Sequence, residues 1–304
     1  IGRRQRQMCI RDRSRMPAWI CKYAAQQCGV PFITTFHGRY GDTNALKRIY
    51  NSIMIRGEFV IAISKFIADD IQSRYQIEDD NLKIIPRGAD ISLFNPEDAS
   101  QQAVNRLIKE WGVPDDTPII MLPARLTRWK GHEILIEALS LINDIRFFCV
   151  LVGDHDTKKN YRSELENRIK FKGLTNRVKI TGHCRDMVSA YKISDIVVSA
   201  SLDPEPFGRV TVEAQAMGCL VVAANHGGAR ETIQHNRTGI LVEPRNSEAL
   251  ADGIKKALEM RTEDRTSMSI AAREFVSGNF SRETMCYRTM SLYCQLLDLK
   301  PQLN

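Results

Sequence analysis

Two glutamates, Glu205 and Glu213, stand eight positions apart in the segment of this chain that is richest in chemistry. The segment reads Asp-Pro-Glu-Pro-Phe-Gly-Arg-Val-Thr-Val-Glu over residues 203–213 and follows an apolar run at 196–200 that is typical of a strand. A proline is tolerated at the first position of a helix because the N–H that it lacks would have no partner there. We therefore expect a helix to begin at Pro206, with Glu205 just before it and Glu213 about two turns inside.

The start of this predicted helix is suited to an anion. Unpaired N–H groups of Gly208, Arg209 and Val210 would carry partial positive charge. Helical side chains lean toward the N-terminus, so Glu213 would point back at a ligand bound there. A carboxylate accepts two hydroxyl hydrogen bonds at once, which suits a sugar or a ribose. The segment thus has the parts needed to hold a sugar nucleotide, with ordinary surface carboxylates as the alternative.

Two cations, Arg125 and Lys130, follow directly after another apolar run at 119–123. In an open parallel sheet, ligands bind beyond the carboxyl ends of the strands at the point where the strand order reverses. Cations held there would neutralise a diphosphate and stabilise it as a leaving group. A solvated basic loop is the alternative interpretation.

Three further motifs stand at predicted strand ends. His37 closes a strand and could hydrogen-bond a sugar hydroxyl or cap the next helix. Arg87 fits either a hinge residue or a phosphate ligand. The loop at 225–231 is rich in glycine, but neither Gly-x-Gly-x-x-Gly nor a Walker A sequence occurs in the chain, so dinucleotide-binding and ATP-hydrolysing functions lack motif support.

Short apolar runs alternate with helical patterns over most of the chain. Strands that are apolar throughout and separated by helices predict an α/β fold with parallel sheets covered on both faces. The predicted strands are 32–37, 59–64, 82–86, 119–123, 147–153, 178–182, 196–200, 219–224 and 239–242. The six from residue 119 onward make one complete doubly wound domain, whereas the three before it are too few for an independent sheet.

We expect four segments. Residues 1–15 form a basic leader, non-native or disordered, that we exclude from the fold. Residues 16–102 form a truncated N-terminal Rossmann-like domain, and residues 103–280 form the complete nucleotide-sugar domain. Residues 281–304 form a C-terminal helix that could pack back on the first domain.

Composition excludes several functional classes. The formal charge is +7, but the leader holds six arginines and one aspartate, so the body is nearly neutral and we expect no nucleic acid. No apolar run reaches the roughly 18 residues of a membrane-spanning helix. The eight cysteines include no Cys-x-x-Cys pair and suggest a reducing cytoplasm without a metal site.

Taken together and in order, these segments resemble the family-4 retaining glycosyltransferases of the two-Rossmann-domain class, GT-B. The resemblance covers nearly all of the chain after residue 15. It rests on Thr35-Phe36-His37-Gly38, Pro86-Arg87-Gly88, Arg125-Leu126, Lys130-Gly131-His132, Val152-Gly153-Asp154, Thr181-Gly182, Glu205-Pro206-Phe207-Gly208, Glu213-Ala214, Gly227-Gly228, Glu231 and Thr238-Gly239.

The resemblance implies a hexosyl transfer from a nucleoside-diphosphate sugar of the UDP, GDP or ADP type to a glycan or lipid-linked acceptor. The resemblance implies no cofactor and no metal. It also implies no conventional general base, because the departing phosphate can itself help to remove the acceptor proton during front-side attack. The implied catalytic residues are His37, Arg125, Lys130 and Glu205. The donor sugar would lie against Glu205 and the backbone of Phe207, Gly208 and Arg209. The residues implied for the nucleotide are Arg125, Lys130, Gly153, His183, Cys184 and Glu213.

The chain departs from the family pattern at two places. Arg87 stands where asparagine is common, and the family's opening strand with its Gly-rich loop has no counterpart, so we expect an N-terminal truncation that could leave this chain inactive. The amino-acid sequences of the motifs are most similar to those of bacterial enzymes of lipopolysaccharide or cell-surface glycan synthesis. A cytoplasmic location, with a peripheral contact at the inner membrane left open, fits that role. A nucleotide-sugar epimerase, a sugar phosphorylase and a non-catalytic nucleotide-binding module remain alternatives.

Overall fold

The computed structural model describes residues 10–12, 14–41, 44–154 and 159–297. The described residues divide into two compact units, one within Ile1–Gly88 and Arg282–Asn304 and the other at Ala89–Ser281. No helix in these ranges is long and apolar enough to cross a membrane.

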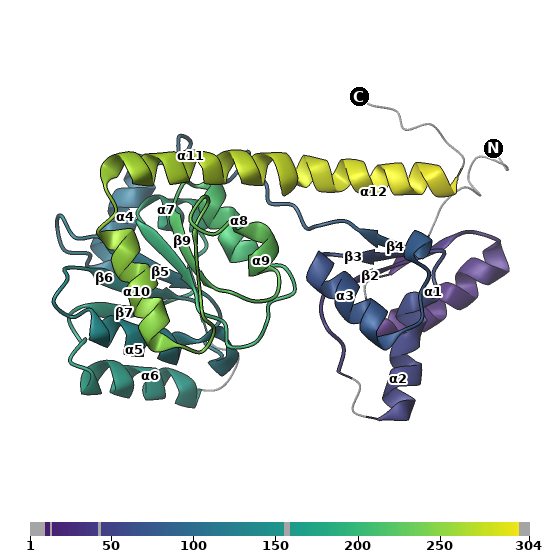
Figure 1. The fold of residues 1–304 in the computed structure, drawn as a ribbon, viewed down its shortest axis with the longest axis horizontal. Helices are drawn as coiled ribbons and strands as arrows, with labels where there is room; N and C mark the ends of the chain where they lie inside the picture. Colours follow the sequence, from purple (N-terminus) through teal and green to yellow (C-terminus); the bar gives the residue numbers. More distant parts are fainter. Residues whose placement is uncertain (1–9, 13, 42–43, 155–158, 298–304) are drawn as a thin grey trace. The chain divides into compact units, whose positions relative to one another are not determined.

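The second unit is built on a six-stranded parallel sheet in the order β10-β9-β8-β5-β6-β7 (Figure 1). The chain moves from β5 outward to β7, then returns to the other side of β5 and continues from β8 to β10. The winding therefore reverses between β5 and β8, and their carboxyl ends border the switch point of the sheet. The strands are β5 (Ile119–Pro123), β6 (Phe148–Val152), β7 (Val178–Gly182), β8 (Ile196–Ser199), β9 (Leu220–Ala224) and β10 (Ile240–Val242).

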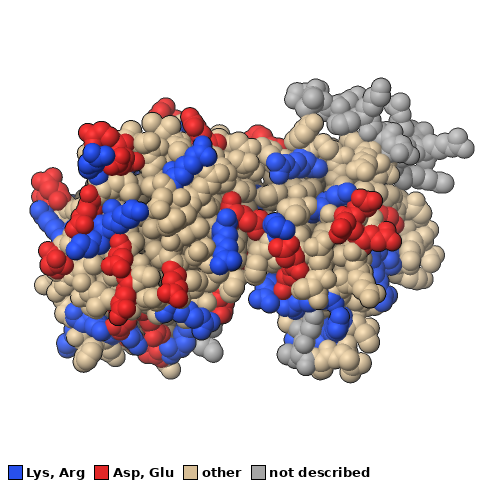
Figure 2. All heavy atoms as spheres, in the orientation of Figure 1, with Lys and Arg blue, Asp and Glu red and all other residues tan. Residues whose placement is uncertain are grey.

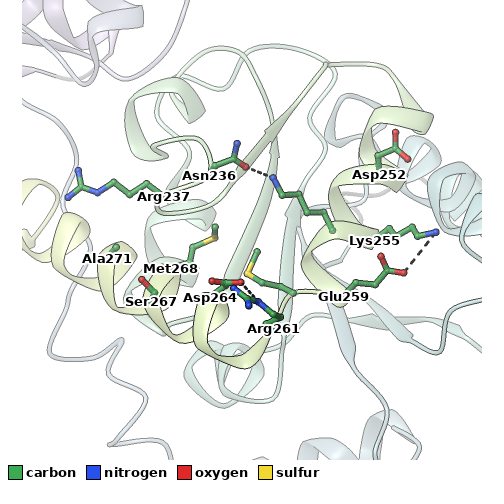
Figure 3. A pocket seen from close by; sticks show the side chains of 12 residues that line it. Asn236, Arg237, Asp252, Lys255, Glu259, Arg261, Asp264, Ser267, Met268 and Ala271 are labelled. Atoms are coloured by element: carbon green, nitrogen blue, oxygen red, sulfur yellow. Dashed lines mark hydrogen bonds and ion pairs between the residues drawn. The ribbon is translucent and has the colours of Figure 1, made fainter.

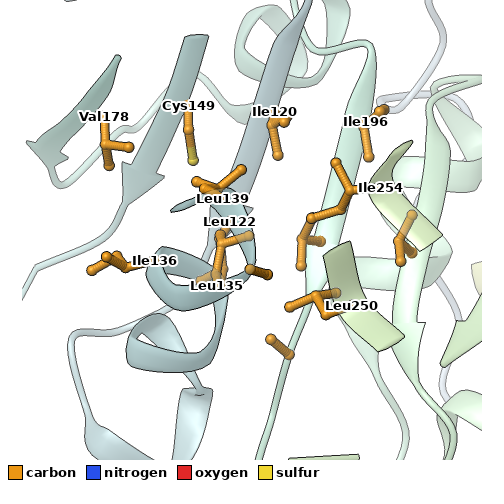
Figure 4. Close-up of a cluster of buried hydrophobic side chains, with 14 of the residues drawn as sticks. Ile120, Leu122, Leu135, Ile136, Leu139, Cys149, Val178, Ile196, Leu250 and Ile254 are labelled. Carbon is orange, nitrogen blue, oxygen red and sulfur yellow. The ribbon is translucent and has the colours of Figure 1, made fainter. Parts of the chain in front are cut away.

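Successive side chains of β5 point to opposite faces of this sheet, and each face carries its own core. Ile120 and Leu122 are buried against one set of helices, in the cluster drawn in Figure 4. Met121, between them, is buried in the cluster on the other face. The first cluster includes residues of α5 (His132–Leu141), α6 (Lys159–Phe171) and α10 (Ser247–Leu258). The second includes residues of α4 (Gln101–Trp111), α7 (Met187–Lys192), α8 (Arg209–Ala216) and α9 (Ala229–Thr232).

The first unit has a four-stranded parallel sheet in the order β1-β2-β3-β4. The C-terminal helix α12 (Arg282–Leu296) packs on this sheet, where Leu292 joins Ile33 and Ile61 in a buried cluster. The other elements of the unit are β1 (Ile10–Asp12), β2 (Phe32–Phe36), β3 (Phe59–Ala62), β4 (Leu82–Ile84), α1 (Arg15–Cys28), α2 (Ala45–Asn51) and α3 (Lys65–Arg74).

The described residues of the predicted leader do not match our expectation of a segment outside the fold. Ile10–Asp12 pairs in parallel with β2, with Ile10 opposite Phe32, and α1 already begins at Arg15. The first sheet therefore has four strands instead of the expected three. Three residues, of which only Ile10 is apolar, show no hydrophobic periodicity, so only the neighbouring strand reveals this pairing. Residues 1–9 and 13, also assigned to the leader, lie outside the described residues.

Candidate functional site

Three loops of the second unit meet beyond the carboxyl ends of β5, β8 and β9. The backbone N–H of Leu202 donates to the carbonyl of Trp129 at 2.7 Å, which joins the first loop to the second. The N–H of Gly228 donates to the carbonyl of Glu205 at 2.8 Å, which joins the second loop to the third. These bonds fix the loops at the switch point, where the sequence predicted a ligand.

Glycines make these close approaches possible. A Cβ atom on Gly131 would lie 1.8 Å from the carbonyl oxygen of Ala200, and Gly131 has a φ of +74°. A Cβ atom on Gly228 would lie 2.3 Å from the carbonyl oxygen of Phe207. Real Cβ atoms do not approach backbone this closely, so both positions require glycine for packing. The Gly-rich loop at 225–228 therefore supports the Glu205 segment.

The central feature of the site is an ion pair between Lys130 and Glu205. The Lys130 Nζ lies 2.7 Å from Glu205 Oε1, and the two side chains are only 14% and 15% exposed. The hydroxyl of Ser201 donates to the same Oε1 atom. The Lys130 ammonium also lies 4.2 Å from the centroid of the Trp129 ring, within the range of a cation–π contact. Residues 75 positions apart are thus brought together at the switch point.

The loop that carries Lys130 is also tied to α5 and α6 by ion pairs. Arg128 Nη1 lies 2.9 Å from Glu133 Oε1, and Arg128 also pairs with Glu164. Arg168 extends the network, at 3.1 Å from Glu133 and 2.6 Å from Glu137. Figure 2 shows basic and acidic side chains intermingled on the face of the second unit that carries these helices. Several linked charges hold a loop better than one exposed pair does.

Helix α8 begins later than the sequence predicts. It starts at Arg209, because Gly208 is left-handed (φ +91°, ψ 60°) and ends the turn that contains Pro206. Glu213 therefore lies about one turn inside the helix instead of two. The N–H groups that we expect to bind an anion still lie at the start of this helix. Arg209 is exposed, and its guanidinium pairs with Glu213 at 3.3 Å.

Glu213 is largely shielded, with its side chain only 13% exposed, and it has two partners in the structure. The Tyr191 hydroxyl donates to its Oε2 at 3.0 Å, and the Arg209 guanidinium lies near its Oε1. Burial raises the pKa of Glu213 above its usual value, while the Arg209 charge and the Tyr191 hydrogen bond oppose that shift. The same burial, with the Glu213 charge beside it, raises the pKa of Tyr191 well above its usual value.

Other predicted residues lie around this centre. Phe207 is buried and packs edge-on against Phe280, with ring centroids 5.6 Å apart, so only its backbone can serve a ligand. Arg125 is exposed on the same loop as Lys130. Beyond β6 and β7, on the far side of β5 from Glu205, lie Gly153, His183 and Cys184. There the N–H of Gly153 donates to the carbonyl of Gly182 at 2.8 Å. Cys184 is half-buried, which raises the pKa of its thiol, and His183 is exposed beside it.

His37 and Arg87, interpreted separately from the sequence, contact each other within the first unit. The Arg87 Nη2 lies 2.8 Å from the His37 Nδ1. A guanidinium can only donate, so Nδ1 must accept, and the imidazole is neutral with its proton on Nε2. Arg87 therefore sets the tautomer of His37.

Several residues of the site had no signal in the sequence. Ser201 and His226 bond around Glu205, with the His226 Nε2 donating to the Ser201 carbonyl at 2.9 Å. Tyr191 looks like an ordinary apolar residue of a short helix and reaches Glu213 only in the fold. Among residues 10–12, 14–41, 44–154 and 159–297, no group of three or more His, Cys, Asp or Glu side chains could hold a metal.

A groove of about 830 Å³ lies elsewhere on the second unit, between α10 and α11 (Thr262–Asn279) (Figure 3). It also includes Asn236, just before β10, so it lies at the opposite end of the strands from Lys130. Its charges are engaged with neighbouring polar groups. Lys256 donates to Asn236 at 2.8 Å, and Arg261 pairs with Asp264 at 2.9 Å. We therefore do not assign the active site to this groove, despite its size.

Two family models match the chain. The one described as "Glycosyl transferases group 1" matches residues 104–275, which include both partners of the Lys130–Glu205 pair. The one described as "Glycosyltransferase Family 4" matches residues 12–93. The chain belongs to the group 1 glycosyltransferases.

Solved structures agree with this assignment. A glycosyltransferase from Rickettsia africae ESF-5 superimposes with a TM-score of 0.90 at 39% identity, over 96% of this chain and 77% of that one. Anabaena Alr3699/HepE in complex with UDP gives a TM-score of 0.86 at 28% identity, over 94% and 78%. The predicted α/β fold of the GT-B class is therefore confirmed for this group 1 glycosyltransferase.

Curated relatives are longer than this chain. The uncharacterized glycosyltransferase MJ1607 of Methanocaldococcus jannaschii is 28% identical over 76% of the chain, which spans 61% of that protein. D-inositol 3-phosphate glycosyltransferase of Corynebacterium glutamicum is 28% identical over 70% of the chain, which spans 52% of that protein. The chain therefore spans about half to two thirds of the length of these two relatives.

Proposed function

We propose that the second unit of this group 1 glycosyltransferase binds a nucleoside-diphosphate sugar at the Lys130–Glu205 site. The observation that carries the proposal is the sparsely exposed ion pair at the switch point, with Arg125 on the same loop. Lys130 and Arg125 would neutralise the diphosphate, and Glu205 with the backbone of Phe207–Arg209 would accept and donate hydrogen bonds to the sugar. The UDP complexes of Alr3699/HepE support a nucleotide donor.

The proposed reaction is a retaining hexosyl transfer to a glycan or lipid-linked acceptor. The bond between the anomeric carbon and the phosphate oxygen breaks, the acceptor oxygen takes its place on the same face, and the departing phosphate receives the acceptor proton. The cations stabilise the charge that develops on the leaving group.

Calorimetric titration of the chain with UDP, GDP and ADP tests the donor site. We expect one of the three to bind with a stoichiometry of one, and that result names the base. Relatives of this chain leave this choice open, since Alr3699/HepE was solved with UDP, whereas a relative from Mycobacterium tuberculosis, 29% identical, is a GDP-mannose-dependent mannosyltransferase. Absence of heat and of competition with all three nucleotides would contradict the proposed function.

Glu213→Gln is expected to raise the stability of the fold relative to the wild type and to weaken nucleotide binding. Because the pKa of Glu213 is raised in the folded state, folding favours the protonated carboxyl, and the wild type loses stability as the pH rises through and above the usual value of 4.5. The glutamine has no such loss, so its stability relative to the wild type should increase as the pH rises above about 4.5. Its affinity for the nucleotide should fall about tenfold, since a neutral amide accepts ribose hydroxyls less strongly.

Denaturation at several pH values and calorimetry measure the two effects on one preparation. Glu274→Gln, at an exposed carboxylate of α11, is the matched control and should change neither quantity. Unchanged nucleotide affinity in Glu213→Gln would remove Glu213 from the ribose site.

The proposed enzyme works on cell-surface glycans at the cytoplasmic side of the inner membrane. Helix α1 supports a peripheral contact there, because Ile20 and Tyr23 are 68% and 66% exposed on one face of it. Arg56 lies 5.4 Å from the centroid of the neighbouring Trp19 ring, so cations border the apolar face. Such a face suits an anionic lipid surface. Flotation with vesicles of anionic phospholipid should fall at least threefold in Ile20→Asp, and unchanged flotation would exclude this face.

A further inference from the structure

The Lys130–Glu205 pair places a carboxylate in competition with the diphosphate for one ammonium. Lys130 Nζ is 2.7 Å from Glu205 Oε1, and both side chains are about 85% shielded from water. A lysine ammonium is a compact charge with three donors, and a diphosphate bound next to it would share that charge with Glu205. Two anions beside one cation also repel each other, and this repulsion is stronger where little water is present to screen it.

Glu205 is also held in place, so it cannot relieve this repulsion by turning away. Its Oε1 accepts a hydrogen bond from the Ser201 hydroxyl as well as from Lys130. The Ser201 carbonyl in turn receives a hydrogen bond from His226 at 2.9 Å. The Glu205 backbone carbonyl accepts from Gly228 at 2.8 Å. Three loops therefore fix the carboxylate beside Lys130.

The sugar nucleotide and the free nucleoside diphosphate affect the Glu205 carboxylate differently. While the sugar is attached, its hydroxyls would donate hydrogen bonds to Glu205 and compensate its charge. After transfer the sugar has left with the acceptor, and the acceptor proton passes from the phosphate to solvent. The diphosphate then carries one more negative charge, and Glu205 has lost the sugar donors.

We propose that Glu205 promotes release of the nucleoside diphosphate by reclaiming Lys130 once the sugar has gone. Glu205 thus has two effects of opposite sign, because it strengthens binding of the sugar nucleotide and weakens binding of the free nucleotide. The inference rests on the proposed function, in which Lys130 binds the diphosphate.

Calorimetry on the whole chain tests the inference with the nucleoside diphosphate that the wild type binds and with the corresponding glucose conjugate. Glu205→Gln keeps the shape of the side chain and removes its charge. We expect it to bind the free nucleotide about 3- to 30-fold more tightly and the sugar nucleotide at least threefold more weakly.

Asp203→Asn is the matched control, since Asp203 is an exposed carboxylate two positions away that pairs with Arg245 at 2.9 Å. It should change either affinity by less than twofold. Glu205→Asp, which retracts the carboxylate, should give a smaller gain of the same sign and carries the test if the glutamine variant does not fold.

The outcomes separate the two proposals. A wild-type chain that binds no nucleotide contradicts the proposed function itself. A wild-type chain that binds, with a Glu205→Gln variant that binds the free nucleotide equally or more weakly, overturns only the role of Glu205 in release. An equal gain in Asp203→Asn would also overturn it, because the effect would then not be specific to the carboxylate beside Lys130.

Discussion

Lys130→Met is expected to weaken binding of the nucleoside-diphosphate sugar by about 100-fold, the equivalent of about 2.7 kcal/mol. Lys130 is a largely shielded cation at the switch point, and its ammonium lies 2.7 Å from Glu205 Oε1. Removing one member of a shielded charge pair typically costs about 2–5 kcal/mol, since the ligand loses its counter-charge and the remaining carboxylate repels it. Calorimetry, or competition with a labelled nucleotide, measures the loss.

Two variants control this experiment. Lys130→Arg keeps the charge but changes its shape, and its affinity should lie between those of the wild type and the methionine variant. Lys255→Met removes a lysine from the groove of Figure 3, where it pairs with Glu259 at 4.0 Å, and should leave binding within twofold. A loss confined to Lys255→Met would move the donor site to that groove.

Gly131→Ala is expected to destabilise the second unit by about 3 kcal/mol or more. The added Cβ would lie 1.8 Å from the Ala200 carbonyl oxygen and 2.7 Å from its carbon, so the loop after β5 would have to move away from β8. That movement would also separate Lys130 from Glu205, and nucleotide binding should fall together with stability. Urea denaturation followed by circular dichroism measures the first effect.

Gly173→Ala separates the clash from the backbone conformation. Gly173 has a φ of +70°, close to that of Gly131, but a Cβ atom there would have nothing within 4 Å. It should therefore cost only about 1 kcal/mol, the price of a left-handed alanine, and leave binding unchanged. Equal destabilisation by the two substitutions would mean that the contact with Ala200 does not position the loop.

The central strands of the second unit, β5, β6, β8 and β9, were predictable because they are buried on both faces. Runs such as 119–123 and 196–200 are apolar throughout, and the structure places β5 and β8 within them. Helix starts were harder, since α8 begins at Arg209 and not at Pro206. The sequence contains both the proline and the glycine, but only the fold shows that Gly208 adopts a left-handed conformation.

The individual residues of the candidate site could be predicted from the sequence, but the contacts between them could not. Position after a strand identified Lys130 and Glu205, because parallel strands end at a common edge. That they pair directly depends on the strand order, which places β8 beside β5 although β6 and β7 intervene in the chain. Periodicity does not encode such order. The same holds for Tyr191, which reaches Glu213 from a different helix.

Hydrogen–deuterium exchange with and without a saturating nucleotide sugar tests the central claim most directly. The donor site assigned to the β5–β8 switch point predicts that backbone amides of 125–131 and 201–213 become protected, and that those of 252–271, along the groove of Figure 3, do not. Protection confined to the groove segments, or none in 125–131 and 201–213 at saturation, would contradict the account.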